Sequence, residues 1–216
     1  MSNKTSKNSV NIENNFIFNC WYVAGWSEYF SDTLTPLRIL DQEIVIFRTT
    51  AGTAAALEDA CPHRKLPLSK GRLIGNSVEC GYHGLTFDCN GKCVRAPTQE
   101  GKPPNVNVKS YPVIDRYNIL WIWMGDPTKA NPDLIYNIPN FDNPTWGKTA
   151  KGTMDIACHY LHVTDNLLDP SHVAWVHVTS FAGAGTGELP LETKKINDGV
   201  IVYRWVLNAP PPPYYE

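Results

Sequence analysis

The chain has 216 residues, 43% of them hydrophobic and 19% charged, a composition typical of a globular protein with one or two domains. The formal net charge of −2 excludes the basic composition of a nucleic-acid-binding domain. No apolar run approaches the roughly 20 residues that span a bilayer. We therefore expect neither a nucleic-acid partner nor a membrane association.

Residues 1–15 are polar and rich in Asn, without the apolar segment of a signal peptide. We expect a disordered tail here. The chain has six cysteines: Cys20, Cys61, Cys80, Cys89, Cys93 and Cys158. In the absence of a secretion signal we expect reduced thiols and a cytoplasmic location.

Short runs of β-branched and aromatic residues, separated by turn residues, occupy residues 16–126. Examples are residues 43–48, 54–57 and 119–123. Strands of this length and spacing predict a small antiparallel β domain. Its Asn90-Gly91 pair is a hairpin turn signal. The cysteines that flank this pair have no His beside them, so we interpret them as hairpin residues and not as a second metal site.

The pattern changes in the second part of the chain. Residues 127–150 are rich in Pro, Asn and Asp and predict a linker or loop. The apolar spacing predicts a helix over residues 154–168 and a second short helix from Pro170, with Asp169 as its N-cap. Two strands are predicted near residues 191–195 and 199–207. We expect residues 151–216 to form the first part of an α+β domain, which makes the fold class of the chain α+β.

Two short motifs inside the β domain each offer one thiolate and one imidazole. The first hook, residues 61–64, reads Cys-Pro-His-Arg, and sixteen residues separate its His from the second hook, residues 80–83, which reads Cys-Gly-Tyr-His. The candidate ligands are Cys61, His63, Cys80 and His83. Two Cys and two His are the ligands of a Rieske [2Fe–2S] centre, in which the two Cys hold one iron and the two His the other.

A structural zinc site uses the same four ligands. Zinc motifs, however, usually pair Cys with Cys and His with His. Each hook in this chain mixes the two residue types, so each can give a Cys to one iron and a His to the other. We therefore predict an iron–sulfur cluster that accepts and passes on single electrons.

The four remaining histidines lie within nineteen residues of one another: His159, His162, His172 and His177. A ferrous non-haem oxygenase site needs two imidazoles and one carboxylate on one side, with open positions for O₂. His172 and His177 form one candidate pair if the chain bends near Pro170. His159 and His162, at i and i+3 of a helix, form the alternative pair.

With these motifs the chain resembles the oxygenase component of the Rieske non-haem iron oxygenases, in particular the vanillate O-demethylase and dicamba monooxygenase branch. The two hooks match the cluster motifs of the family. Residues 165–172 (Asp-Asn-Leu-Leu-Asp-Pro-Ser-His), followed by His177, match its mononuclear iron motif. The resemblance implies a Rieske domain and then a helix-grip-like catalytic domain.

The resemblance also implies roles for individual residues. His172 and His177 correspond to the Fe(II) ligands, and Asn166 to a residue near the iron. Asp169 corresponds to a carboxylate that carries electrons between a cluster histidine, here His83, and an iron histidine of a neighbouring subunit. His159 and His162 match no ligand of the family. The third iron ligand of the family is a downstream carboxylate without a counterpart here, so we expect a C-terminally truncated chain that is inactive alone.

The implied function is that of a terminal oxygenase. Electrons from NAD(P)H reach the cluster through a reductase or ferredoxin partner and pass to Fe(II), which uses O₂ to hydroxylate or O-demethylate a small aromatic substrate. The implied assembly is a head-to-tail homotrimer. Two alternatives stay open: an aromatic-ring dioxygenase, and a Rieske electron-transfer protein without its own chemistry.

Overall fold

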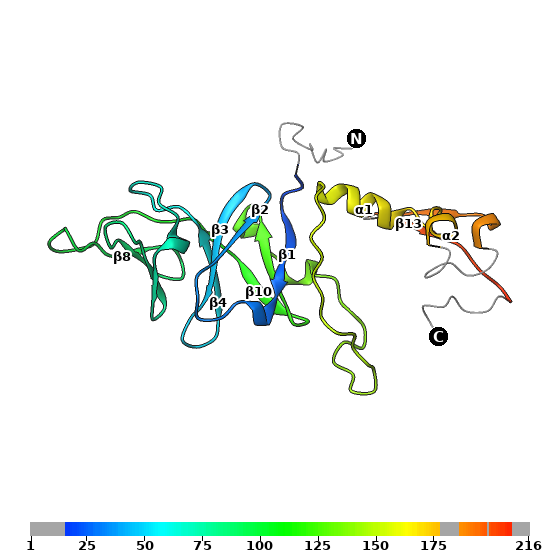
Figure 1. The fold of residues 1–216 in the computed structure, drawn as a ribbon, viewed down its shortest axis with the longest axis horizontal. Coiled ribbons are helices and arrows are strands. Elements are labelled where there is room, and N and C mark those ends of the chain that lie inside the picture. The colour runs from blue at the N-terminus through cyan, green and yellow to red at the C-terminus, as the bar shows by residue number, and fades with distance from the viewer. Residues whose placement is uncertain (1–15, 178–185, 198, 209–216) are drawn as a thin grey trace, which may run out of the picture. The chain divides into compact units, whose positions relative to one another are not determined.

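The structure of the protein is a computed structural model that describes residues 16–177, 186–197 and 199–208 (Figure 1). The predicted tail at residues 1–15 lies outside these residues. The chain forms two compact units, residues 1–151 and residues 152–216. Antiparallel strands dominate and the helices are few and short, which confirms the α+β fold class.

The first unit contains short antiparallel strands joined by tight turns. Its strands are β1 (Cys20–Trp26), β2 (Thr35–Ile39), β3 (Gln42–Arg48), β4 (Ala54–Glu58), β5 (Arg72–Ile74), β6 (Ser77–Glu79), β7 (Thr86–Phe87), β8 (Cys93–Arg95), β9 (Ser110–Tyr111), β10 (Val113–Arg116) and β11 (Ile119–Met124). Single 3₁₀ turns are η1 (Ser27–Tyr29), η2 (Leu68–Lys70), η3 (Pro127–Lys129) and η4 (Pro132–Leu134). The strands predicted at residues 43–48, 54–57 and 119–123 are confirmed.

The strands of this unit form three sheets. Their orders are β1-β11-β10, β2-β3-β4-β9 and β5-β6-β7-β8, and every pair is antiparallel. In Figure 1 the sheet that ends in β8 extends from one side of the β3–β4 region. The strands of that third sheet alternate with the hooks along the chain. Strands β5 and β6 lie between the two hooks, β6 leads directly into Cys80, and β7 follows the second hook.

Strand β3 is buried on both faces and separates two apolar cores. Val45 and Phe47 pack into one core with the two hook cysteines, Cys61 and Cys80. The alternate residues of β3, including Ile44, belong to a second core with β1, β10 and β11. A strand with apolar neighbours on both sides reads as a continuous hydrophobic run, which explains the sequence Ile-Val-Ile-Phe at positions 44–47. The core that supports the hooks is therefore continuous with the central sheet.

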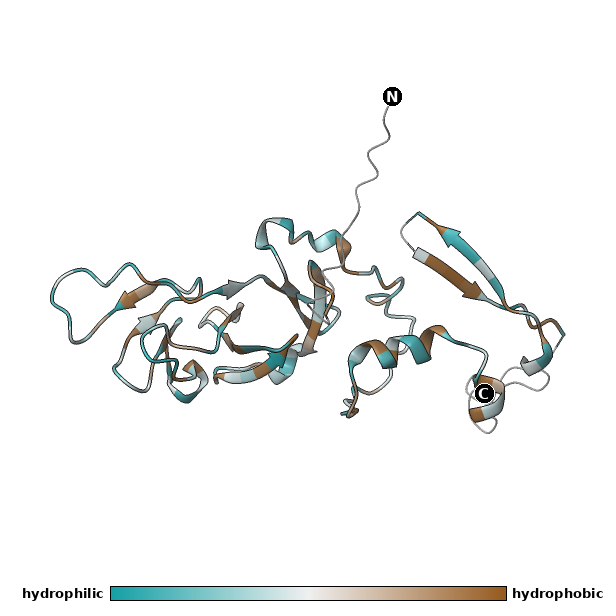
Figure 2. Cartoon of the chain, turned by 90° about the horizontal axis from the view of Figure 1, so that it is seen from above, coloured by the Kyte–Doolittle hydropathy of each residue, from teal (hydrophilic) through white to brown (hydrophobic). Residues whose placement is uncertain are grey.

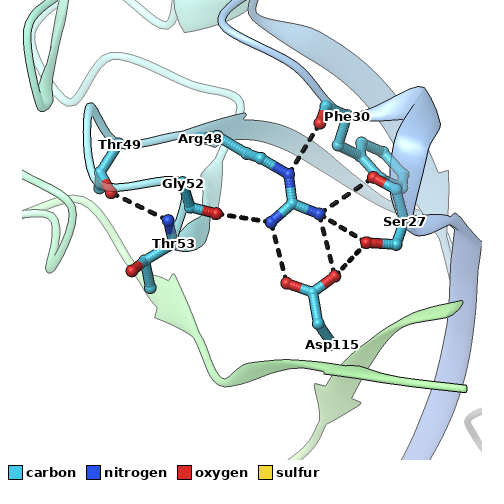
Figure 3. Close-up of polar contacts among 7 residues, drawn as sticks. All are labelled: Ser27, Phe30, Arg48, Thr49, Gly52, Thr53 and Asp115. Atoms are coloured by element: carbon cyan, nitrogen blue, oxygen red, sulfur yellow. Dashed lines mark hydrogen bonds and ion pairs between the residues drawn. The ribbon is translucent and has the colours of Figure 1, made fainter. Parts of the chain in front are cut away.

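Arg48, the last residue of β3, connects the segment after β1, the β3–β4 turn and strand β10 through hydrogen bonds (Figure 3). Its guanidinium donates to both carboxylate oxygens of Asp115 on β10 at 2.8 and 2.9 Å. It also donates to the backbone carbonyls of Ser27, Phe30 and Gly52 at 2.7–2.9 Å. The pKa of the Asp115 carboxyl is lowered, chiefly by the hydrogen bond from Arg48. The planar fork of Arg is suited to this bidentate contact.

The second unit contains two helices and a hairpin. The helices are α1 (Tyr160–Leu168) and α2 (Val173–Val176), with a 3₁₀ turn η5 (Thr186–Glu188), and the antiparallel strands are β12 (Glu192–Ile196) and β13 (Gly199–Tyr203). Figure 2 shows β12 as mainly hydrophilic and β13 as hydrophobic. Both strands agree with the prediction except that β13 ends at Tyr203. None of the helices described in either unit is long and apolar enough to cross a bilayer.

The predicted helix starts in this unit were wrong. Helix α1 begins at Tyr160 and not at residue 154, because the His159 ring accepts a hydrogen bond from the Leu161 N–H at 3.3 Å and acts as the N-cap. Helix α2 begins at Val173 and not at Pro170. The Asp169 carboxylate accepts the Ser171 N–H at 2.9 Å in a turn that precedes α2.

Candidate metal centres

The first hook is closed by two backbone hydrogen bonds. The Cys61 N–H donates to the Leu66 carbonyl at 2.9 Å, and the Lys65 N–H donates to the Cys61 carbonyl at 2.8 Å. Lys65 has a positive φ of 58°, which turns the chain back toward Cys61. The loop is thus held by the backbone itself, with the Cys at its base.

The second hook repeats this construction at the same offsets. The Cys80 N–H donates to the Leu85 carbonyl at 2.8 Å, and the Gly84 N–H donates to the Cys80 carbonyl at 3.0 Å. Gly84 has a φ of 72°, in the region where glycine has no steric penalty. A Cβ on Gly84 would lie 2.9 Å from Pro97, so a side chain is also excluded by space. The two hooks are closely similar loops, with the His at the third position in one and the fourth in the other.

The four candidate ligands of the hooks lie together, with sulfur inside and nitrogen outside. The thiol residues Cys61 and Cys80 are only 2% and 3% exposed and belong to the same apolar core. His63 and His83 are exposed, and their ring centroids are 4.6 Å apart. All four line one small cavity. Paired thiols below paired imidazoles match the donor set of a Rieske cluster, in which two Cys hold one iron and two His hold the other.

The Cys61 thiol has a raised pKa, first because burial penalises the thiolate and also because of the neighbouring Cys80. Backbone hydrogen bonds from His63 and Arg64 to the sulfur act in the opposite direction. Iron binding requires the thiolate, so loading of the site would release the proton. Hydrogen bonds to cluster sulfurs are one of the means by which a protein sets the reduction potential.

A row of four side chains crosses the sheet next to the second hook. Arg72 on β5, Glu79 on β6, Thr86 on β7 and Arg95 on β8 are successive cross-strand partners, so they share one face of the sheet. Glu79 is 4% exposed, and its carboxylate accepts Arg72 Nε at 3.1 Å and Arg95 Nη1 at 3.0 Å. The Thr86 hydroxyl donates to the Gly84 carbonyl at 3.1 Å. The row therefore ties the second hook to all four strands.

A second buried carboxylate supports the segment after the first hook. Asp59 is 7% exposed and accepts both the N–H and the hydroxyl of Ser69 at 2.6 Å. This fixes η2, whose Leu68 is fully buried beside the hook cysteines. Sequence reasoning missed both Asp59 and Glu79. The available signal was the position of each acid within two residues of a candidate Cys ligand.

A larger cavity of about 310 Å³ lies against the exposed side of the hooks. His63 and His83 form part of its wall, and the loop that follows β8 contributes Ala96, Thr98 and Gln99. The imidazole edges therefore face open space on one side. Cys93 and Cys89, the cysteines of the β7–β8 hairpin, pack into the core beneath.

In the second unit, His172 and His177 cap the two ends of α2, and their ring centroids are 5.4 Å apart. The His172 Nδ1 contacts the Asp169 backbone carbonyl. Because a carbonyl only accepts, this contact places the proton on Nδ1 and leaves Nε2 as the nitrogen able to bind a metal. The short helix thus brings together two imidazoles five residues apart, a spacing that a longer regular helix would not bring to one face.

Asn166 lies in the last turn of α1, and Asp169 follows this helix as its C-cap. The Asp169 N–H donates to the Asn166 carbonyl at 3.3 Å, and its carboxylate accepts from the Ser171 N–H and hydroxyl. These Ser171 hydrogen bonds, the hydroxyl first, lower the pKa of the Asp169 carboxyl. Asp169 thus stays an anion next to His172.

The alternative pair is farther apart, with the His159 and His162 ring centroids at 6.4 Å. Throughout the described parts of both units, no three His, Cys, Asp or Glu side chains converge as they would around one metal ion. A Rieske cluster takes only two protein ligands per iron, so the hooks need no such group. His172 and His177 thus offer two nitrogen donors near one another, and their role as iron ligands stays a prediction.

Comparison with known proteins assigns both parts of the chain. Residues 20–112 match the Rieske [2Fe-2S] domain, and residues 156–216 match the vanillate O-demethylase oxygenase C-terminal domain. The chain is 41% identical to the toluene-4-sulfonate monooxygenase system iron-sulfur subunit TsaM1 of Comamonas testosteroni, over 89% of this chain and 56% of that protein. It is 39% identical to a vanillate O-demethylase oxygenase subunit of a Pseudomonas species, over 92% of this chain and 55% of that protein.

A solved structure gives the same result. Dicamba monooxygenase bound to 3,6-dichlorosalicylic acid matches with a TM-score of 0.83 and 34% identity, over 93% of this chain and 59% of that one. The chain spans about half the length of the curated relatives it matches. A Rieske domain with paired Cys–His hooks is followed by residues of a vanillate O-demethylase-type C-terminal domain, and the chain therefore belongs to the Rieske [2Fe-2S] proteins that carry this C-terminal domain.

Proposed function

We propose that the chain belongs to a terminal oxygenase in which Cys61, His63, Cys80 and His83 hold a [2Fe–2S] cluster that receives electrons one at a time. The arrangement of the hooks is the observation that carries this proposal. Two buried cysteines lie below two exposed imidazoles whose centroids are 4.6 Å apart. Histidine ligands raise the potential of such a cluster above that of an all-Cys one.

In the same proposal His172 and His177 hold a ferrous ion, which when bound supplies the activation of O₂ for hydroxylation or O-demethylation of a small aromatic substrate. The Asp169 carbonyl orients the His172 ring through Nδ1 and keeps Nε2 available. In this proposal Asn166, three residues before Asp169 in the chain, lies near the iron. The third ligand in this proposal would be a carboxylate.

We also propose the assembly and the partners. Asp169 would link His83 of one copy to His172 of the next copy in a head-to-tail homotrimer, because a carboxylate between two imidazoles orients both rings. A reductase would deliver electrons from NAD(P)H. The oxygenase subunits among the relatives support this division of labour, and six free cysteines support a reducing cytoplasm.

Metal analysis and EPR of the purified chain test the cluster. We expect two iron and two sulfide per chain, a brown colour and an EPR signal on reduction. Cys80→Ser should lose all three, because the inner iron loses a thiolate. Cys158→Ser is the matched control, since this cysteine is exposed and lies in the second unit. A colourless protein that holds one zinc would refute the cluster.

Iron titration of paired His variants tests the second centre. Ferrous ion added anaerobically to the cluster-loaded chain should bind more weakly by at least tenfold in His177→Ala, because one of two nitrogen donors is gone. His162→Ala, from the alternative pair, should bind as the wild type does. The reverse order of effects would assign the iron to His159 and His162.

A further inference from the structure

The residues around the hooks carry a charge opposite to that of the rest of the chain. Residues 61–108 contain seven Lys and Arg against three Asp and Glu, whereas the remaining residues contain twelve against eighteen. The overall charge of −2 thus hides a positive region beside the candidate cluster. Charge asymmetry of this kind steers association with partners of the opposite sign.

Two of the three acids in this region are already engaged. Glu79 is buried between Arg72 and Arg95. The Asp88 carboxylate accepts two backbone N–H groups, those of Asn90 and Lys92, each at 2.9 Å, in the β7–β8 turn. Little negative charge is left to offset the exposed cations.

Four of these cations lie beside the hooks and form what we call the basic patch: Arg64, Lys70, Arg72 and Arg95. Arg64 follows the candidate ligand His63 in the first hook, and the backbone of Lys70 lies against the second hook, since a Cβ on Gly81 would lie 3.0 Å from the Lys70 carbonyl oxygen. Arg72 and Arg95 meet at Glu79, the residue before Cys80. All four side chains are exposed.

Glu79 holds two of the four cations of the patch, Arg72 and Arg95. The Arg72 and Arg95 side chains are 76% and 59% exposed, yet each is tied through one edge of its guanidinium to a carboxylate that is itself buried. Their remaining N–H groups face solvent in set positions. A surface that is already ordered loses less conformational entropy when a partner binds.

We propose that the basic patch docks an acidic electron-transfer protein or domain, which delivers electrons to the cluster at the exposed His63 imidazole. The inference rests on the proposed cluster and names the chemistry of its donor. One electron leaves the reduced one-electron centre of the donor, and one ferric ion of the cluster becomes ferrous. Charge pairs at the rim of such a contact mainly raise the association rate, which then falls with salt.

Stopped-flow reduction of the full chain tests this, with a reduced acidic plant-type [2Fe–2S] ferredoxin as the probe. We expect the second-order rate to fall at least about tenfold between 0.05 and 0.5 M salt. Lys70→Glu and Arg72→Gln should slow it at low salt, and calorimetry should show weaker binding of the oxidised ferredoxin. Lys194→Glu, on β12 of the second unit, should leave both unchanged.

Three controls separate the possible failures. Reduction by the neutral deazariboflavin radical should be the same in all variants, because it needs no docking. If the EPR signal of the cluster is absent in the wild type, the proposed function fails and this inference with it. If the cluster is present but the rates ignore salt and the patch variants, only the docking proposal fails. Binding of duplex DNA to the patch, without binding of ferredoxin, would also overturn the docking proposal.

Discussion

Arg48 shows how one side chain organises the frame that carries the hooks. Its guanidinium makes six hydrogen bonds, to Ser27, Phe30, Gly52 and Asp115, and the side chain is 17% exposed. Loss of the Asp115 charge would leave a partly buried cation without its counter-ion. Removing one partner of such a pair costs more than the pair itself contributes.

This ion pair predicts a specific dependence of stability on pH. The folded pKa of Asp115 is below its ordinary value, so the pair stabilises the protein above about pH 4, and this contribution is lost as the pH falls through the folded pKa. Asp115→Asn should cost about 1 kcal/mol at pH 7, since the carboxyl is 41% exposed, and nothing at the acid end. Urea denaturation from pH 2.5 to 7 measures both.

The control for this prediction is Asp32→Asn, a substitution of an exposed carboxyl in the same unit. Its stability should parallel that of the wild type at every pH. Equal losses in Asp32→Asn and Asp115→Asn would show that overall charge, and not the contact with Arg48, sets the acid stability.

At this scale the sequence singled out candidate ligands, which stay predictions, but not the side chains that support them. Cys and His are chemically distinctive, so the mixed hooks pointed to one type of cluster. Glu79 and Asp59 are ordinary acids in the sequence, and their burial depends on arginines and a serine that only the folded sheet brings near. The Nδ1 contact of His172 likewise needs the backbone of the turn before α2.

Among the elements, the β7–β8 hairpin depends on one backbone approach. Gly91 has a φ of 81°, and a Cβ there would lie 2.0 Å from the Val108 carbonyl oxygen. The Val108 N–H also donates to the Gly91 carbonyl at 2.8 Å. The hairpin can therefore lie against the following segment only if this residue has no side chain.

Substitution of two glycines separates the strain of a positive φ from the steric clash of a Cβ with the backbone of Val108. Gly91→Ala should destabilise the protein by about 2 kcal/mol more than Gly75→Ala, because both residues have positive φ but nothing lies within 4 Å of a Cβ on Gly75. The midpoint of urea denaturation measures the difference, and cluster content should fall with Gly91→Ala. Equal midpoints for the two variants would mean that the Val108 segment moves aside without cost.

Element prediction succeeded where local and tertiary signals agree. The Asn-Gly turn and the β-branched run at residues 44–47 favour strands locally, and burial on both sides of β3 reinforces them. The helix start failed because apolar spacing continues through residues 154–159 although the backbone is not helical there. A histidine N-cap is not among the residues preferred at that position, so His159 gave no signal.

For the whole molecule, the two units differ in how much they bury. The buried hydrophobic residues all lie in the first unit, between Phe30 and Ile135, and the described residues of the second unit include none. The hydrophobic strand β13 and Trp205 remain largely exposed. Stability, and with it protection of the backbone, should be concentrated in the first unit.

Limited proteolysis checks this expectation. Trypsin at low ratio should cut first after exposed Lys194 and Lys195 and leave a resistant fragment that ends near residue 151 and keeps the brown cluster. Mass spectrometry identifies the fragment and absorbance follows the cluster. Cleavage of both units at the same rate would contradict the difference in burial.

The backbone closure of the two hooks has a consequence for the speed of electron transfer. Four hydrogen bonds, at 2.8–3.0 Å, hold the cysteines and the turns around them through the chain itself. A change of one electron at the cluster would then meet a cage that is already in place and need not rearrange. With the proposed cluster bound, the energy of nuclear reorganisation would be small in such a cage, and an electron would arrive and leave quickly even with little driving force.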